Sequence, residues 1–113
     1  MRSRDLRAEM RVPVTHKGAL SSGDSLWFPC LIVDMSDNGI LMMSNREIPV
    51  GQVLDFRCEL FPKQYLECKL EVVHVDDTRL GTKIVEIDEK GMSICKLFLE
   101  EQFAHRLDSV RLK

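Results

Sequence analysis

Two arginines near the start of the sequence are spaced so that they can bind one anionic group together. Arg7 and Arg11 are four residues apart, so their side chains lie on one side of the segment whether it is helical or extended. A guanidinium group presents a planar set of donors that matches a phosphate or the O6/N7 edge of guanine, and its face stacks on a base. These properties indicate a phosphate or a guanine base as the group bound.

A second stretch, "DMSDNG", supplies the complementary acceptors. In an extended strand Asp34 and Ser36 point to one side, where the carboxylate can accept hydrogen bonds from the N1 and N2 hydrogens of guanine. The hydroxyl can bind a phosphate or fix the turn. Gly39 tolerates positive φ and close backbone approach, and Asn38-Gly39 is typical of a tight hairpin turn. Together the two stretches contain the donors and acceptors that a purine nucleotide site needs.

Each stretch alone also has a simpler interpretation. The arginines fit a solvated basic segment, and Asp34 and Ser36 fit side chains that cap their own turn. Only the occurrence of both stretches in one chain favours a binding site over these interpretations.

The elements that must position these residues form a single domain. The 113 residues, 44% hydrophobic and 30% charged, fit one folded unit. No apolar run approaches the ~20 residues of a membrane-spanning helix, and the N-terminal stretch has no apolar signal segment, so a cytoplasmic protein without membrane insertion is expected. We expect a flexible basic arm over residues 1–11, a barrel over 12–88 and a helix over 89–110.

The charge distribution favours a local anion site. Residues 1–17 hold five basic and two acidic side chains, a net +3, so a total of −2 leaves −5 for the rest. A basic arm on an acidic body argues against an extended DNA or RNA surface. A binder of single-stranded RNA would need an aromatic platform, which Trp27, Phe28 and Tyr65 could supply, but their core-like context and the acidic body argue against it.

The cysteines and histidines do not indicate catalysis. Cys30, Cys58, Cys68 and Cys95 have no C-x-x-C spacing, so we expect free buried thiols without a disulfide or a zinc site. The three histidines lack metal-ligand spacing, and no paired acid and base is visible. We therefore expect no metal, no cofactor and no enzymatic activity.

The apolar pattern predicts antiparallel strands followed by one helix. A strand begins near Arg11 and ends about His16, and residues 17–25 are predicted to be a turn-rich connection. A change of parity at Val72-Val73 predicts a β-bulge that bends its strand. The further strands are expected at residues 26–35, 39–44, 53–61, 65–76 and 80–88.

From about Glu89 the apolar period changes to that of a helix. Apolar residues recur there at spacings of three and four, which predicts an amphipathic helix whose buried face comprises Met92, Cys95, Leu99, Phe103 and Leu107. Gly91 lowers the stability of its first turn. The fold class expected is therefore mainly β: a small antiparallel barrel of six or seven strands with a C-terminal α-helix.

These features resemble the PilZ domain family. "RAEMR" matches an R-x-x-x-R motif, "DMSDNG" matches a [D/N]-x-S-x-x-G motif, and the two occur in the family's order. "RLGTKIVEID" is also similar to the family's last strand, and the resemblance covers nearly the whole chain.

The resemblance implies binding of the bacterial second messenger cyclic diguanylate. Arg7 and Arg11 would grip phosphate and guanine, while Asp34, Ser36 and Gly39 complete the pocket. Leu6 stands where the family often has another arginine, which favours one bound ligand molecule over two stacked ones. The ligand would order the arm and change a surface that a downstream protein partner recognises. The alternative is an interaction module of this fold that binds a protein and no nucleotide.

Overall fold

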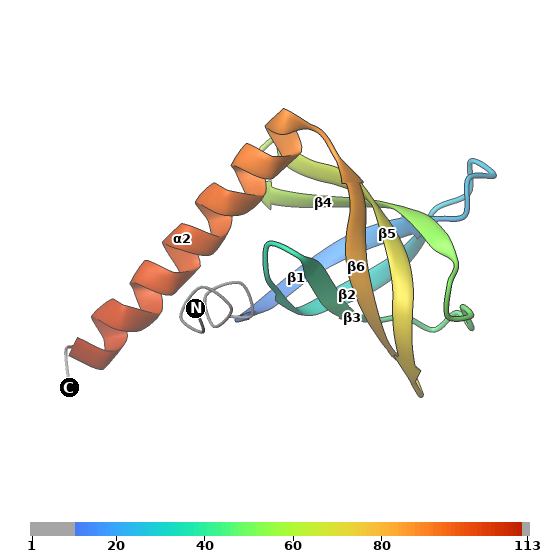
Figure 1. Ribbon diagram of the computed structural model, residues 1–113. Helices are drawn as coiled ribbons and strands as arrows, with labels where there is room; N and C mark the ends of the chain where they lie inside the picture. The colour runs from blue at the N-terminus through green and yellow to red at the C-terminus, as the bar shows by residue number, and fades with distance from the viewer. Residues whose placement is uncertain (1–10, 112–113) are drawn as a thin grey trace, which may run out of the picture.

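The computed structural model describes residues 11–111, with side chains as far as His105. Figure 1 shows a group of strands followed by one long helix. Residues 1–10, which include Leu6, Arg7 and most of the predicted basic arm, lie outside the described residues. The elements are β1 (Val12–Ser21), β2 (Phe28–Met35), β3 (Gly39–Met43), β4 (Val53–Phe61), β5 (Gln64–Asp76), β6 (Arg79–Ile87) and α2 (Glu89–Arg111).

The six strands close into an antiparallel barrel in the order β1-β2-β3-β6-β5-β4. Four of the pairings are between consecutive strands, and the pairings of β3 with β6 and of β1 with β4 complete the circle. Each of the six strands therefore pairs with two neighbours, although β1 pairs with β4 only over Gly18–Ser21. The predicted fold class is confirmed, with six strands.

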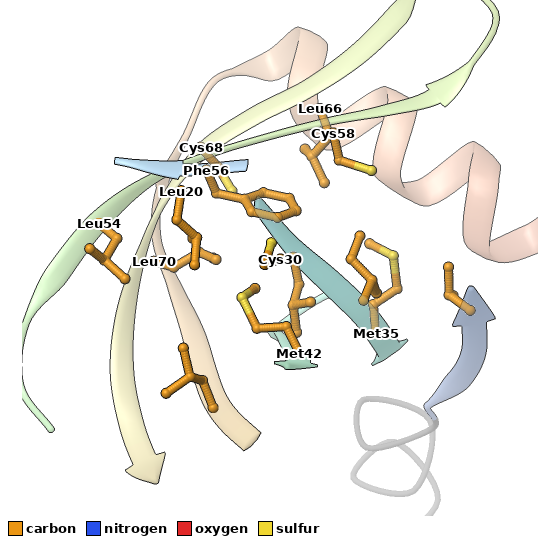
Figure 2. Close-up of a cluster of buried hydrophobic side chains, with 14 of the residues drawn as sticks. Leu20, Cys30, Met35, Met42, Leu54, Phe56, Cys58, Leu66, Cys68 and Leu70 are labelled. Carbon is orange, nitrogen blue, oxygen red and sulfur yellow. The ribbon is translucent and has the colours of Figure 1, made fainter. Parts of the chain in front are cut away.

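The core of the barrel is built from the inward-facing residues of every strand. In β4, Leu54, Phe56, Cys58 and Leu60 are buried in alternation, as predicted. Figure 2 shows Phe56 among leucine side chains and the sulfur-bearing side chains of cysteine and methionine. Full burial of one such apolar side chain contributes roughly 1.5–3 kcal/mol.

Strand β1 is longer than the sequence pattern predicted. It continues through Ser21, and Gly18, predicted to lie in a connection, pairs with both Cys30 and Cys58. A β-carbon on Gly18 would lie 3.0 Å from the Phe56 ring and 3.2 Å from the Cys30 sulfur. Small residues stand here because neighbouring side chains already fill the core, and this composition made the segment resemble a loop.

The predicted bulge in β5 is confirmed. Val72 pairs with Thr82 and His74 pairs with Gly81, so Val73 is the extra residue in β5. The pairing shows the change of parity: Val72 pairs with the buried Thr82, and beyond the bulge Val75 pairs with the buried Leu80, although Val73 and Val75 are themselves exposed.

Helix α2 begins as predicted, and Cys95 is buried and Leu99 partly buried as predicted, but the rest of the packed face differs; the side chain of Leu107 lies outside the described residues. Asp88 caps it, since the Gly91 N–H donates to the Asp88 carboxylate at 2.7 Å. Met92 and Phe103, predicted to be buried, are 52% and 37% exposed. The residues that pack on the barrel are Gly91, Ile94, Cys95 and Phe98, with Leu99 partly buried.

The helix contacts the barrel only along its first half. It lies against β5, β4 and β1 and then extends away from the strands, as Figure 1 shows. No helix in the described part of the chain combines the length and apolar character needed to cross a membrane.

Candidate functional site

Arg11, the residue directly before β1, contacts all three motif residues of the "DMSDNG" stretch. Its Nε donates to Oδ1 of Asp34, its Nη1 to the Ser36 hydroxyl at 3.4 Å, and its Nη2 to the Gly39 carbonyl oxygen at 3.3 Å. The structure thus brings together four of the five residues predicted to bind the ligand. The fifth, Arg7, lies outside the described residues.

A local irregularity of β2 turns Asp34 toward the outside of the barrel. Ile32 pairs with Met42 and Asp34 pairs with Leu41, so Val33 is an extra residue relative to β3. Ile32 is buried, and regular alternation would have pointed Asp34 inward as well. The extra residue changes this parity, so Asp34 faces outward and Met35 is buried instead.

The sequence predicted that strand alternation positions Ser36, but the turn that follows β2 positions it instead. Strand β2 ends at Met35, and the Ser36 N–H donates to the Gly39 carbonyl oxygen at 2.9 Å. The Ser36 hydroxyl is buried in the turn and accepts a hydrogen bond from the Asn38 N–H at 3.2 Å. The hydroxyl therefore fixes the turn and contacts Arg11 at the same time.

Gly39 is needed for close approach, and the predicted positive φ at Asn38-Gly39 is wrong. Neither residue is among those with positive φ in the described chain. A β-carbon on Gly39 would instead lie 2.1 Å from the carbonyl oxygen of Thr82 in β6. The turn is also fixed to β6 by the Ile84 N–H, which donates to the Asn38 carbonyl oxygen at 2.7 Å.

The Arg11 guanidinium keeps donors available for a ligand. Its three bonds to described residues use three of its five N–H groups, which leaves one on each Nη nitrogen. The side chains of Arg11 and Asp34 are 41% and 23% exposed, so the ion pair faces solvent. One carboxylate oxygen of Asp34 binds Arg11, and the other can accept from a ligand.

A cavity among the described residues lies elsewhere on the barrel. It has a volume of about 340 Å³ and contains none of the residues that contact Arg11. Its lining includes Trp27 together with charged side chains of β4, β5 and β6. This cavity is therefore separate from the Arg11 site.

The cysteines do not contribute a reactive group. All four are free and buried, as predicted. Burial raises the pKa of the Cys30 and Cys95 thiols to about 11, and that of the Cys58 and Cys68 thiols to about 12. A thiol with so high a pKa is a poor nucleophile at neutral pH because little thiolate is present. Residues 11–111 contain no group of three or more His, Cys, Asp or Glu side chains placed to hold a metal ion.

A closed six-strand barrel with one C-terminal helix, and an arginine bound to a [D/N]-x-S-x-x-G turn, define a PilZ-type domain. The family model described as PilZ domain matches residues 5–101, so the chain belongs to the PilZ domain family. No curated protein matches the sequence significantly.

Solved structures of PilZ proteins share this fold. The PilZ domain of YcgR from Escherichia coli, solved with c-di-GMP, superposes with a TM-score of 0.70 at 8% identity and covers 90% of this chain and 95% of its own. The Bacillus subtilis inhibitor of motility MotI has a TM-score of 0.70 at 13% identity, and MrkH of K. pneumonia in its apo state has 0.70 at 14%.

The chain spans only about half the length of the two latter proteins. The match covers 85% of this chain and 51% of MotI, and 92% of this chain and 52% of MrkH. At these identities the likeness shows the fold alone.

Proposed function

We propose that the chain is a non-enzymatic receptor for cyclic diguanylate. The observation that carries this proposal is the contact of Arg11 with Asp34, Ser36 and Gly39 at once. These contacts join the two motifs of the family across the start of the barrel. The c-di-GMP in the YcgR PilZ domain structure supports the same ligand class.

Arg11 is held in place before a ligand arrives. Its bonds to the turn fix the guanidinium plane, so little side-chain entropy is lost on binding. Its two remaining N–H groups bind a phosphate oxygen or a guanine edge. The second oxygen of Asp34 accepts from the N1 and N2 hydrogens of guanine, and Arg7 supplies the second guanidinium.

The signal is relayed by the segment that carries Arg7. Binding of the dinucleotide draws residues 1–10 onto the barrel surface next to Arg11, and the combined surface is recognised by a downstream protein. Because Leu6 brings no further guanidinium, a single ligand molecule is bound.

Isothermal titration calorimetry of cyclic diguanylate into the purified chain tests the proposal, with GTP and cyclic GMP as controls. We expect saturable binding of micromolar affinity or better with the dinucleotide alone, at a stoichiometry near one. The absence of both heat and thermal stabilisation at high ligand concentration would contradict the proposal. It would then favour an interaction module that binds no nucleotide.

A further inference from the structure

One row of paired residues continues from the Arg11 site across the outside of the barrel. Asp34 of β2 pairs with Leu41 of β3, Leu41 with Gly81 of β6, and Gly81 with His74 of β5. The row faces outward because the residues that flank Leu41 and Gly81 along their strands are buried. These flanking residues are Ile40, Met42, Leu80 and Thr82.

Gly81 forms an open position in the middle of this row. Among the described residues, two atoms lie within 4 Å of a β-carbon built on Gly81, the His74 β-carbon at 3.3 Å and the His74 carbonyl oxygen at 3.8 Å. This differs from Gly39, which the Thr82 backbone touches, and from Gly18, which core side chains surround. The described residues therefore leave room above Gly81 for a flat group that lies between the side chains of Leu41 and His74.

Two cationic residues stand on either side of this open position. Arg79 and Lys83 precede and follow Gly81 by two residues on β6, so all three face the same side of the strand. Both side chains are exposed, and the Lys83 ammonium lies 4.0 Å from a carboxylate oxygen of Glu71, at the limit of an ion pair. A flat apolar position between two cations suits a base that carries a phosphate on its sugar.

We propose that Leu41, His74, Arg79, Gly81 and Lys83, here called the β6 surface, bind the second half of the cyclic dinucleotide. This inference rests on the proposed function, in which Arg11 and Asp34 hold the first half. Two strand spacings separate Asp34 from Gly81, about 10 Å, so a ligand with two bases reaches both positions. The second base lies over Gly81 against Leu41 and the imidazole of His74, while Arg79 and Lys83 face the phosphate.

The test compares ligand affinity in paired variants by calorimetry. The double variant His74→Ala with Arg79→Ala is expected to bind cyclic diguanylate tenfold or more weakly than the parent chain. The matched control is His105→Ala with Arg57→Ala, two exposed residues of the same types away from the row, and its affinity stays that of the parent. The side chains changed in both variants are exposed, so the barrel is expected to fold in each.

A second readout distinguishes contact from an indirect effect. In a ¹⁵N NMR titration of the parent chain, the backbone amides of Gly81 and Lys83 are expected to shift with the same affinity as the calorimetric signal. If the parent binds while the double variant binds equally well and these amides do not move, the inference is wrong and the proposed function stands. If the parent itself does not bind, the proposed function fails and this inference fails with it.

Discussion

Gly39 lies so close to Thr82 that a β-carbon on Gly39 would be 2.1 Å from the Thr82 carbonyl oxygen. The contact joins the turn that holds Arg11 to strand β6, where Ile40 pairs with Thr82 and the Thr82 hydroxyl donates to the Ile40 carbonyl oxygen at 2.8 Å. The glycine therefore determines both the pairing of β3 with β6 and the position of an acceptor for Arg11.

Gly39→Ala is expected to destabilise the barrel because the added methyl group must displace a backbone carbonyl. Such overpacking typically costs about 1–3 kcal/mol, and ligand affinity falls as well because the Gly39 carbonyl moves. Urea unfolding measures the first effect and calorimetry the second. Gly23→Ala is the control, since Gly23 has a φ of 98° but no atom within 4 Å of its β-carbon, and it changes backbone strain alone. Equal unfolding free energies for Gly39→Ala and the parent would contradict the close approach.

Arg11→Ala is expected to weaken binding of cyclic diguanylate by about tenfold to more than a hundredfold. The basis is the roughly 1.5–3 kcal/mol that a charge-assisted hydrogen bond contributes. The unfolding free energy changes by less than about 1 kcal/mol because the ion pair with Asp34 faces solvent. Arg57→Ala removes another exposed ion pair, which joins β4 to Glu67 of β5, and serves as the control. If Arg11→Ala binds cyclic diguanylate as tightly as the parent, Arg11 does not contact the ligand.

The sequence predicted those strands in which apolar and polar residues alternate without interruption. Strand β4 follows its pattern closely, because one face of a barrel strand is buried and the other is wet. The predicted length of β1 was too short, because Gly18 contributes no side chain to the apolar pattern and core groups from neighbouring strands surround it. The packing of other strands around Gly18 depends on tertiary contacts, which cannot be predicted from the local sequence.

The two motifs predicted which residues Arg11 contacts, but not the geometry of these contacts. The outward direction of Asp34 depends on the extra residue at Val33, which appears in the sequence only as a change of parity between Ile32 and Met35. The need for glycine at position 39 depends on Thr82, which is 43 positions away in the sequence. The helix face depends on how α2 meets the barrel, because only its first half is covered.

Asp34→Asn and Asp34→Ala are expected to separate the charge of this side chain from its acceptor oxygen. An amide oxygen can still accept from Arg11 Nε, but the amide NH₂ group cannot accept from guanine as the second carboxylate oxygen does, so Asp34→Asn is expected to bind more weakly than the parent and more tightly than Asp34→Ala. Asp34→Ala leaves Arg11 without this partner, and we expect a loss of about tenfold or more. Calorimetry of both variants decides the matter. An Asn variant as weak as the Ala variant would mean that the negative charge is required.

Phe98→Ala is expected to be the most damaging single change in α2. The Phe98 ring is 2% exposed and contacts His16 and Phe61 edge to face, with centroid distances of 5.2 and 5.8 Å. Removal of a buried phenylalanine side chain costs about 3–5 kcal/mol, whereas Phe103→Ala, at a position 37% exposed, costs less than about 1 kcal/mol. Urea unfolding of the two variants gives the comparison. Similar losses for both would indicate that α2 packs through the face predicted from the sequence.

The unfolding free energy is expected to fall as the pH rises above about 9. Burial raises the pKa of the Cys58 thiol from 9.0 to about 12, and the other three thiols are shifted in the same direction. The folded chain therefore keeps protons that the unfolded chain releases, so this contribution is fully present below pH 9 and is lost as the pH approaches 12.

Urea unfolding at several pH values between about 8 and 11 measures this loss. Cys58→Ala removes one of the four titrating thiols and is expected to make the fall with pH shallower than in the parent. Reaction with a thiol reagent near neutral pH gives an independent check, since native thiols should react slowly and all four should react in denaturant. Rapid reaction of the native chain, or an unfolding free energy that is constant over this range, would show that the thiols are accessible to water.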